Sequence, residues 1–346
     1  MLILEDFLSY SLKQQSDHVP FDVRIGDHTR AYSPVAGVVC FEPMMSVTEP
    51  SKHIVLSSGV HGNETAPIEI CNSIIRDIAS ESIKLVHQVM FIFGNLPAIK
   101  KQTRFIQENL NRLFSPDIDA SNFERKRAIE LMEAVSNFFS SASGERHHYD
   151  LHTAIRDSKN EKFAIYPYTQ NSNIQRSKQA KSELRFMSDC GVNTILLTES
   201  TTPTFSYYSS FHHQAHTFTV ELGKVKPFGQ NDMSRFEKVS RMLRRLLQEE
   251  VLNLTPFEQC PLLLYEVSQT INKQFDDFRL HFNDDLANFS TFKKGSVLAS
   301  EGASAGSGGN KIEYSAQQDG EAIVFPNADV AIGQRAMLTV VPCKFK

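Results

Sequence analysis

Residues 53–80 read HIVLSSGVHGNETAPIEICNSIIRDIAS. The first seven, HIVLSSG (53–59), are typical of a buried strand that runs into a glycine turn. Residues 65–80 then place apolar side chains on one helical face, and Pro67 is tolerated because it lies in the first turn. A strand, a short loop and a helix in this order are typical of an α/β domain.

The same alternation continues through the first two thirds of the chain. Helices are predicted at 121–142 and at 231–252. Ser121 and Glu124 have the spacing of a capping box at the start of the first of these helices. Strands that alternate with helices indicate a mainly parallel sheet that helices cover on both faces. The further strands are predicted at 86–95, 147–153, 162–168, 193–198 and 216–223.

Two domains are predicted, one over residues 1–255 and a smaller, β-rich one over residues 256–346. The second contains short β-like pieces, such as LLLYEVSQTI (262–271), and no convincing long helix. Its segment ASAGSGGN (303–310) is typical of a flexible loop or hairpin tip.

Composition and charge argue against several classes of function. Hydrophobic residues make up 41% and charged residues 22% of the 346 residues, which is ordinary globular composition. The formal net charge is −4, so there is no broad basic character to hold a nucleic-acid backbone. A membrane span is not expected, because no apolar run of about eighteen residues is present. The amino terminus also lacks the basic and apolar regions of a secretory signal.

The five cysteines are scattered, odd in number and form no CxxC pair. Such a set favours neither a disulfide framework nor a cysteine–zinc site, and it suits a reducing compartment. We therefore expect a cytoplasmic protein that acts on a small molecule, without a nucleic-acid or membrane partner. Whether it forms a homo-oligomer stays open.

The sequence GVHGNE (59–64) lies between a predicted strand and a predicted helix. His61 and Glu64 are three residues apart, so one turn at the helix entrance can aim both side chains at one point. Imidazole nitrogen and carboxylate oxygen are both zinc ligands, and a catalytic zinc takes three protein ligands and one open position. An HxxE pair is common by chance and also suits a solvated loop, so a third ligand is needed.

A second predicted strand ends in a histidine. His152 closes YDLH (149–152), and open α/β sheets bind ligands at the carboxyl ends of their strands. Asp150 could accept the second N–H of that imidazole, as carboxylates beside metal-bound histidines usually do. His147 and His148 are rivals for the third-ligand position, but they lie at the start of the strand. The alternative for His152 is an ordinary histidine at a strand end.

Two further patterns carry groups that suit amide hydrolysis. Glu221, in TVELG (219–223), ends another predicted strand, where a carboxylate could take a proton from water and pass it to a leaving amine. An ion pair with a nearby lysine is the alternative. The segment RFIQENLNR (104–112) gathers two arginines and an asparagine, and guanidinium groups bind carboxylates and polarise carbonyls. A solvated basic loop is the alternative here.

Together, HGNE, TRFI followed by NLNR, DLH and VELG resemble, in this order, the succinylglutamate desuccinylase/aspartoacylase family, a branch of the zinc carboxypeptidase superfamily. The resemblance covers roughly residues 50–255 and segments such as EAIVFPNADVAIGQ near the end. Four motifs in order at compatible spacing are far more specific than any one of them. The longer phrases DLHTAIRDS and TVELGKVKPFGQND are more similar to the desuccinylase branch than to the aspartoacylase branch.

The resemblance implies a metal centre and a base. It implies that His61, Glu64 and His152 hold one zinc ion per subunit. It also implies that Glu221 is the general base. These roles agree with the chemistry of the residues, because zinc lowers the pKa of its water to about 7 and a nearby carboxylate can accept the proton.

The resemblance also implies substrate contacts and a fold. Arg104 would polarise the carbonyl, and Asn111 with Arg112 would bind the α-carboxylate of glutamate. The implied fold is a zinc-carboxypeptidase-like α/β domain with a mixed sheet flanked by helices, and a β-rich C-terminal domain that helps to close the active site. Two departures stand out. Aspartoacylases carry Asp where this chain has Asn109, and a substrate-binding tyrosine where PNADVAIGQ (326–334) has none.

The implied function is zinc-dependent hydrolysis of N-succinyl-L-glutamate to succinate and L-glutamate, the last step of arginine catabolism by the succinyltransferase route. The rivals are a deacylase of another N-acyl amino acid, a peptide-cutting carboxypeptidase, and a non-catalytic zinc- or anion-binding module. Glu221 argues against the module, because a binder has no use for a base. Arg156, four residues after His152, is our hypothesis for the partner of the succinyl carboxylate. An exposed pair with Asp157 is the alternative.

Overall fold

The computed structural model describes residues 2–14, 18–44, 52–167, 178–198, 201–302 and 311–345. The loop predicted at 303–310 lies outside these ranges. The α-helices of the described residues are α1 (Leu2–Glu5), α2 (Phe7–Lys13), α3 (Thr65–Ala79), α4 (Leu96–Lys101), α5 (Phe123–Ser140), α7 (Lys178–Asp189), α8 (Phe205–His213) and α9 (Glu237–Gln248). The short 3-10 helices are η1 (Leu110–Arg112), η2 (Met233–Phe236) and η3 (Phe257–Gln259). Among these residues, no helix has the length and apolar character that crossing a membrane requires.

The strands divide between the two parts of the chain. The first part contains β1 (Phe21–Ile25), β2 (Thr29–Ser33), β3 (Val38–Pro43), β4 (His53–Ser58), β5 (Gln88–Phe93), β6 (Arg146–Ala154), β7 (Phe163–Tyr166), β8 (Thr194–Leu197) and β9 (His216–Lys224). The second contains β10 (Leu263–Asn272), β11 (Arg279–Leu280), β12 (Thr291–Phe292), β13 (Val297–Glu301), β14 (Ile312–Ser315), β15 (Glu321–Val324) and β16 (Arg335–Cys343).

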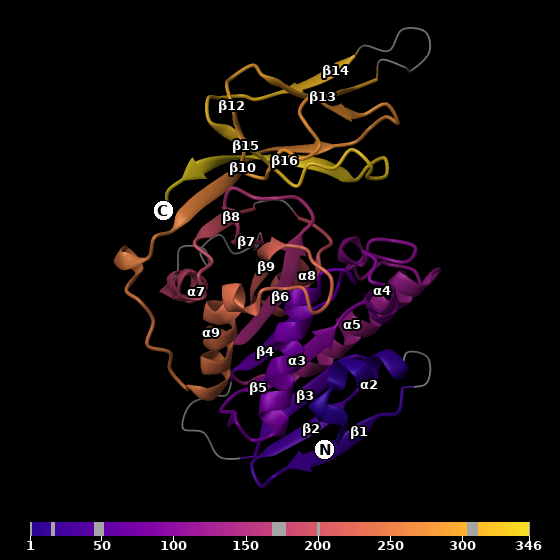
Figure 1. Cartoon of the computed structure of the whole chain (residues 1–346), viewed down its shortest axis with the longest axis vertical. Helices are drawn as coiled ribbons and strands as arrows, with labels where there is room; N and C mark the ends of the chain where they lie inside the picture. Colours follow the sequence, from indigo (N-terminus) through magenta and orange to yellow (C-terminus); the bar gives the residue numbers. More distant parts are fainter. Residues whose placement is uncertain are drawn as a thin grey trace.

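The described strands form one large mixed sheet and one small sheet (Figure 1). The large sheet has the order β1-β2-β3-β5-β4-β6-β9-β7-β8-β10-β16-β15-β12, and the small one β11-β13-β14. The pairs β5–β4, β4–β6, β6–β9, β7–β8 and β8–β10 are parallel, and the others are antiparallel. The α/β class and the β-rich C-terminal part are therefore confirmed, but the prediction of a mainly parallel sheet is wrong, because antiparallel pairs flank the parallel ones and also join β9 to β7.

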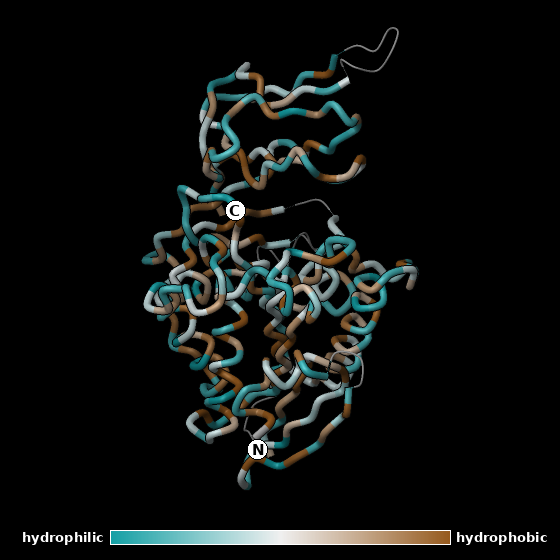
Figure 2. Tube along the Cα trace, turned by 45° about the vertical axis from the view of Figure 1, so that its right-hand side comes forward, coloured by the Kyte–Doolittle hydropathy of each residue, from teal (hydrophilic) through white to brown (hydrophobic). Residues whose placement is uncertain are grey.

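Strand β4 lies between two cores. All six of its residues are buried. Ile54 and Leu56 join the core that α3, α7 and α9 cover, and Val55 joins the core that α5 and α8 cover. Because successive side chains of a strand point to opposite faces, a strand covered on both faces must be apolar at consecutive positions. Figure 2 shows hydrophobic and hydrophilic residues interleaved along the outer elements, which have one face in the core.

Two predicted helices have different ends in the structure. The helix predicted at 121–142 is α5, and Asn122 rather than Ser121 caps it by accepting the backbone N–H of Arg125. The helix predicted at 231–252 is α9, which begins only after the 3-10 turn η2. A capping side chain decides the start of α5, because the unpaired N–H groups of a first turn take the nearest available acceptor, whereas Asp232 caps η2 instead of α9.

The predicted capping box at Glu124 is wrong. The Glu124 carboxylate is buried and accepts the backbone N–H groups of Ile106 and Gln107 at 2.7 and 3.2 Å. A buried carboxylate needs several donors, and the loop before η1 supplies them. Glu124 therefore fixes the loop that follows Arg104, instead of its own helix end.

Strand β10 connects the two parts of the chain within one sheet. Its residues Leu263 to Glu266 pair in parallel with β8, and the strand also pairs antiparallel with β16. A separate core that includes Leu298, Ile323 and Met337 lies in the C-terminal part. Figure 1 shows this part as a β layer beyond the α/β part. The predicted domain boundary falls in the connection between α9 and β10 and stays a prediction.

Candidate metal centre

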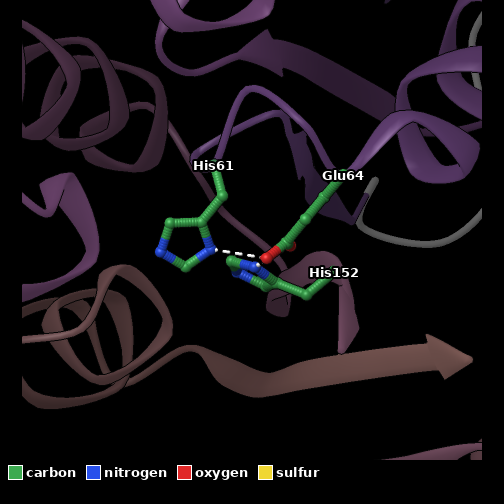
Figure 3. A group of neighbouring side chains, drawn as sticks. All are labelled: His61, Glu64 and His152. Atoms are coloured by element: carbon green, nitrogen blue, oxygen red, sulfur yellow. Dashed lines mark hydrogen bonds and ion pairs between the residues drawn. The ribbon is translucent and has the colours of Figure 1, made fainter. Parts of the chain in front are cut away.

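Three of the residues predicted as zinc ligands meet at the carboxyl ends of β4 and β6 (Figure 3). His61 and Glu64 come from the loop between β4 and α3, and His152 comes from β6. One candidate ligand atom from each residue lies within 4.8 Å of the other two. All three side chains are buried. The structure thus brings together residues that lie far apart in the chain.

The loop that carries His61 and Glu64 packs tightly against α4. A Cβ atom on Gly62 would lie 2.1 Å from the carbonyl carbon of Ala98, so only glycine fits there. The Gly62 N–H also donates to the carbonyl of Arg104 at 3.1 Å. The glycine of the HGNE motif is therefore a packing requirement, and it places the metal loop beside the Arg104 loop.

One ring nitrogen of each histidine is fixed by a neighbouring acceptor. His61 Nε2 lies 2.9 Å from Asn109 Oδ1, and His152 Nε2 lies 2.7 Å from Asp150 Oδ2. Because both acceptors are oxygen atoms, each Nε2 can donate its proton to them, and in the neutral form of each ring Nδ1 then presents a lone pair. The Asp150 contact is the one expected from the sequence. Asn109 makes the equivalent contact to His61 with an amide oxygen.

The two Nδ1 atoms face the same carboxylate. His61 Nδ1 lies 2.8 Å from Glu64 Oε1, and His152 Nδ1 lies 2.8 Å from Glu64 Oε2. The His61 Nδ1 atom is buried and has no hydrogen-bond partner among the described residues. A lone pair that faces a carboxylate oxygen at this distance is repelled unless a cation lies between them. A metal ion therefore fits this set of donors.

A buried chain of hydrogen bonds supports Asp150 from behind. Ser57 donates to Asp150 Oδ1 at 2.5 Å, and its hydroxyl lies 2.8 Å from His148 Nε2. His148 Nδ1 in turn lies 2.7 Å from the hydroxyl of Ser209. The rival ligand His148 is thus directed away from the metal centre, and it belongs to the hydrogen-bond chain that holds Asp150 in place. The other rival, His147, is directed to acidic groups at the opposite end of β6.

Glu221 lies directly beside the candidate ligands. In the parallel pair β6–β9 it is the partner of His152. Burial and the neighbouring Glu64 carboxylate raise the pKa of Glu221 to about 7. Its Oε2 atom is buried and has no hydrogen-bond partner in the described part of the chain. A carboxylate with a free oxygen and a pKa near neutrality can accept and release a proton.

Arg104 borders the centre on the side of α4. Its Nη1 donates to Glu64 Oε1 at 2.9 Å, and its side chain is about one-third exposed, at 32%. Burial, together with the charge of Arg104, lowers the pKa of His61 to about 4. His61 is therefore neutral at ordinary pH, as an imidazole must be to bind a metal.

Asn111 and Arg112 lie in η1, next to His152. Asn111 is buried, and its Oδ1 accepts the backbone N–H of Phe205 at 3.0 Å while its Nδ2 lies 3.5 Å from His152 Nε2. Arg112 is half-buried and donates to the Asn111 carbonyl at 2.7 Å. Burial and the nearby charge of Arg335 lower the pKa of Arg112 to about 9. A cationic side chain is thus held at the edge of the centre.

Arg156 faces the C-terminal part. Its guanidinium donates to the backbone carbonyls of Leu286 at 3.2 Å and Pro326 at 3.4 Å. The alternative partner from the sequence, Asp157, instead pairs with Lys224 at 2.8 Å. Arg156 thus connects the segment after β6 to loops of the C-terminal part, and its role toward the succinyl group stays a prediction.

Two contributors to this region, Ser57 and Arg335, were not predicted from the sequence, whereas Asn109 stood out as a departure from the family pattern. Ser57 carried a signal, because a polar residue inside a buried strand must find a partner. Arg335 carried no signal, because it lies in no motif and reaches this region only through the pairing of β16.

Comparisons with known proteins cover both parts of the chain. Residues 50–247 match the family described as succinylglutamate desuccinylase/aspartoacylase catalytic domain, and residues 260–343 match the AstE/AspA barrel-sandwich hybrid domain. The chain is 51% identical over 330 residues to a succinylglutamate desuccinylase of Pseudoalteromonas atlantica, covering 93% of this chain and 90% of that protein. It is 49% identical over 350 residues to one of Shewanella frigidimarina, covering 99% and 97%.

Solved structures agree with these matches. The chain resembles the succinylglutamate desuccinylase of Vibrio cholerae with a TM-score of 0.86 and 34% identity, over 97% of this chain and 94% of that one. It resembles the one from Chromobacterium violaceum with a TM-score of 0.81 and 33% identity, over 98% of each chain. The similarity therefore extends over both the α/β part and the β-rich part.

Proposed function

Because the chain belongs to the succinylglutamate desuccinylase/aspartoacylase family, we propose that it hydrolyses N-succinyl-L-glutamate to succinate and L-glutamate. The observation that carries the proposal is the meeting of His61, Glu64 and His152 with a free carboxylate oxygen of Glu221. This set combines a cation site with a group that can transfer a proton, as hydrolysis of an amide requires.

We propose that His61, Glu64 and His152 hold one zinc ion per subunit. Zinc at these ligands would supply a Lewis acid that polarises the scissile carbonyl and makes water more acidic. Glu221 would accept a proton from the attacking water and deliver it to the leaving amine, and its buried carboxylate oxygen without a hydrogen-bond partner in the described part of the chain supports this role. Arg104 would donate to the carbonyl oxygen as negative charge develops there.

The substrate has three carboxylates, and each needs a partner. Asn111 and Arg112 are proposed for the α-carboxylate, which the Asn111 amide beside His152 and the half-buried Arg112 next to it support. Arg156 is proposed for the succinyl carboxylate, which its position four residues after His152 supports. The Arg156 guanidinium also donates to the carbonyls of Leu286 and Pro326, so it would bind the succinyl carboxylate with its other N–H groups.

We also propose the wider setting of the reaction. Residues 1–255 would form the catalytic domain, and residues 256–346 would form a β-rich domain that helps to close the site. All five cysteines are free thiols, which supports a reducing cytoplasm as the location. The reaction would be the last step of arginine catabolism by the succinyltransferase route.

A substrate panel tests the proposal. Zinc-loaded protein is incubated with N-succinyl-L-glutamate, N-acetyl-L-aspartate and a short peptide, and free amine is followed. We expect about one zinc per chain and clear preference for N-succinyl-L-glutamate. His61→Ala and His152→Ala should lose both zinc and turnover, whereas His212→Ala, a change at an exposed histidine, should keep both.

The other outcomes identify the rival functions. Preference for N-acetyl-L-aspartate would indicate a deacylase of another N-acyl amino acid, and cleavage of the peptide would indicate a carboxypeptidase. Zinc binding without turnover of any substrate would indicate a binding module. Full zinc occupancy in His152→Ala would move the third ligand to another residue.

A further inference from the structure

The γ-carboxylate of the glutamate half has no partner among the residues assigned so far. Arg112 and Asn111 are assigned to the α-carboxylate, Arg104 to the carbonyl, and Arg156 to the succinyl end. A carboxylate that leaves water for a partly buried site requires a cationic or multiply donating partner. The C-terminal part supplies one such group at Arg335.

A chain of contacts connects Arg335 to the proposed base. Arg335 begins β16 and pairs with Asn272 of β10. Its guanidinium carbon lies 5.7 Å from the centre of the Phe325 ring, and that ring lies 5.5 Å from the ring of Phe163. Phe163 is the antiparallel partner of Glu221 across β7 and β9, and directly opposite residues project from the same face of a sheet. Arg335 therefore lies on the Glu221 side of the sheet.

A second connection runs to Arg112. The charge of Arg335 contributes, after burial, to lowering the pKa of Arg112. Burial also lowers the pKa of Arg335, to about 10. Within the described ranges, Arg112 donates to the Asn111 carbonyl and Arg335 lies over the Phe325 ring, and neither of these partners is a carboxylate. Two neighbouring cations without a counterion repel each other, and an anionic ligand relieves that repulsion.

We propose that Arg335 binds the γ-carboxylate of the glutamate half while Arg112 binds its α-carboxylate. The inference rests on the proposed function. The α- and γ-carboxylates of glutamate are separated by only three carbon atoms, so two neighbouring guanidinium groups can each hold one. The succinyl carboxylate lies beyond the scissile carbonyl, on the other side of the reacting bond. Arg335 therefore acts as a specificity residue for glutamate, contributed by the β-rich part.

The test compares two substrates that differ only at the γ position, N-succinyl-L-glutamate and N-succinyl-L-glutamine. Arg335→Gln should lower kcat/KM on the glutamate substrate by about 10- to 100-fold, the range typical of a lost charge-assisted hydrogen bond, mainly through KM. Activity on the glutamine substrate should change by less than about threefold. Arg335→Lys should recover part of the loss. Arg279→Gln, at an exposed arginine of β11, should leave both substrates unaffected.

Each contrary result has a clear meaning. An equal loss on N-succinyl-L-glutamate, N-succinyl-L-glutamine and N-acetyl-L-glutamate would show that Arg335 is structural, and would overturn the proposal. A loss on both succinyl substrates that spares N-acetyl-L-glutamate would place Arg335 at the succinyl end and also overturn it. If the unaltered protein cleaves neither substrate, the proposed function fails instead. Calorimetric binding of L-glutamate and L-glutamine to both proteins then still tests the γ-carboxylate contact, because Arg335→Gln should abolish any preference for L-glutamate.

Discussion

The acceptors behind His61 and His152 differ in charge. Asp150 Oδ2 accepts from His152, and the neutral amide oxygen of Asn109 accepts from His61. A carboxylate makes the imidazole a stronger donor to a metal than an amide does. The buried Ser57 hydroxyl also keeps Asp150 in place. Zinc affinity should therefore depend more on Asp150 than on Asn109.

We predict that Asp150→Asn weakens zinc binding by about 10- to 100-fold, the range typical of residues that orient metal ligands. Asn109→Ala should have a smaller effect, and Asn137→Ala, on the exposed face of α5, should have none. Competition with a chromogenic chelator measures the three dissociation constants. Unchanged zinc affinity in Asp150→Asn would mean that the bond to His152 does not support metal binding.

Residues inside short motifs could be predicted from the sequence, and isolated ones could not. His61 and Glu64 are neighbours in the chain, so one turn of backbone sets their geometry. His152 and Glu221 both end strands of one sheet, and the edge where parallel strands end is a known ligand site. Arg335 lies more than a hundred residues after Glu221 and is placed by the register of β16 with β10, which no local pattern encodes.

Single elements could be predicted in type, but their ends could not. The strands at 53–59 and 216–223 were expected from apolar runs, and β4 and β9 confirm them. Helix starts depend on which side chain takes the first free N–H groups, and α5 uses Asn122. Glu124 was misassigned because its partners come from another loop.

Strand β6 carries a second buried charge pair at its amino end. His147 Nδ1 lies 3.4 Å from Glu183 Oε1 of α7, and Tyr149 donates to the same carboxylate at 2.9 Å. Burial opposes the charge on His147, but Glu183 and Glu145 outweigh it and raise its pKa to about 9. Burial likewise opposes the charge on Glu183, but His147 lowers its pKa to about 2.

The pair predicts a defined dependence of stability on pH. Because the pKa of His147 is raised, its charge stabilises the fold fully below about pH 6.5. This contribution is lost as the pH rises through about 9. Because the pKa of Glu183 is lowered, its charge stabilises the fold fully above about pH 4.5. This contribution is lost as the pH falls through about 2. The pair is therefore most stabilising between about pH 4.5 and 6.5.

His147→Gln should reduce the free energy of unfolding by about 3–5 kcal/mol near pH 5.5, because it leaves a buried carboxylate without its partner. The difference from the unaltered protein should shrink toward pH 9.5, where His147 is already neutral. Thermal unfolding across this pH range measures the effect, with exposed His212→Gln as the control. A difference in Tm that does not vary with pH would show that the pair is not ionised.

At the scale of the whole molecule, the α/β part and the β-rich part share one sheet. The change of composition after residue 255 predicted the β-rich character of the second part. It did not predict that β10 would pair with β8, because that pairing joins residues about seventy positions apart. The shared sheet fixes β16, and with it Arg335, relative to the metal centre.

In the proposed mechanism, Glu221 transfers the proton at a metal centre that other residues hold. The most direct test measures kcat on N-succinyl-L-glutamate and zinc content in Glu221→Gln, with Glu161→Gln, an exposed acid near β9, as the control. We predict about one zinc per chain and a fall in kcat of at least the ~10²–10⁴-fold typical of general acid–base groups. A nearly normal kcat would remove Glu221 from the mechanism, and loss of zinc would make it part of the metal site.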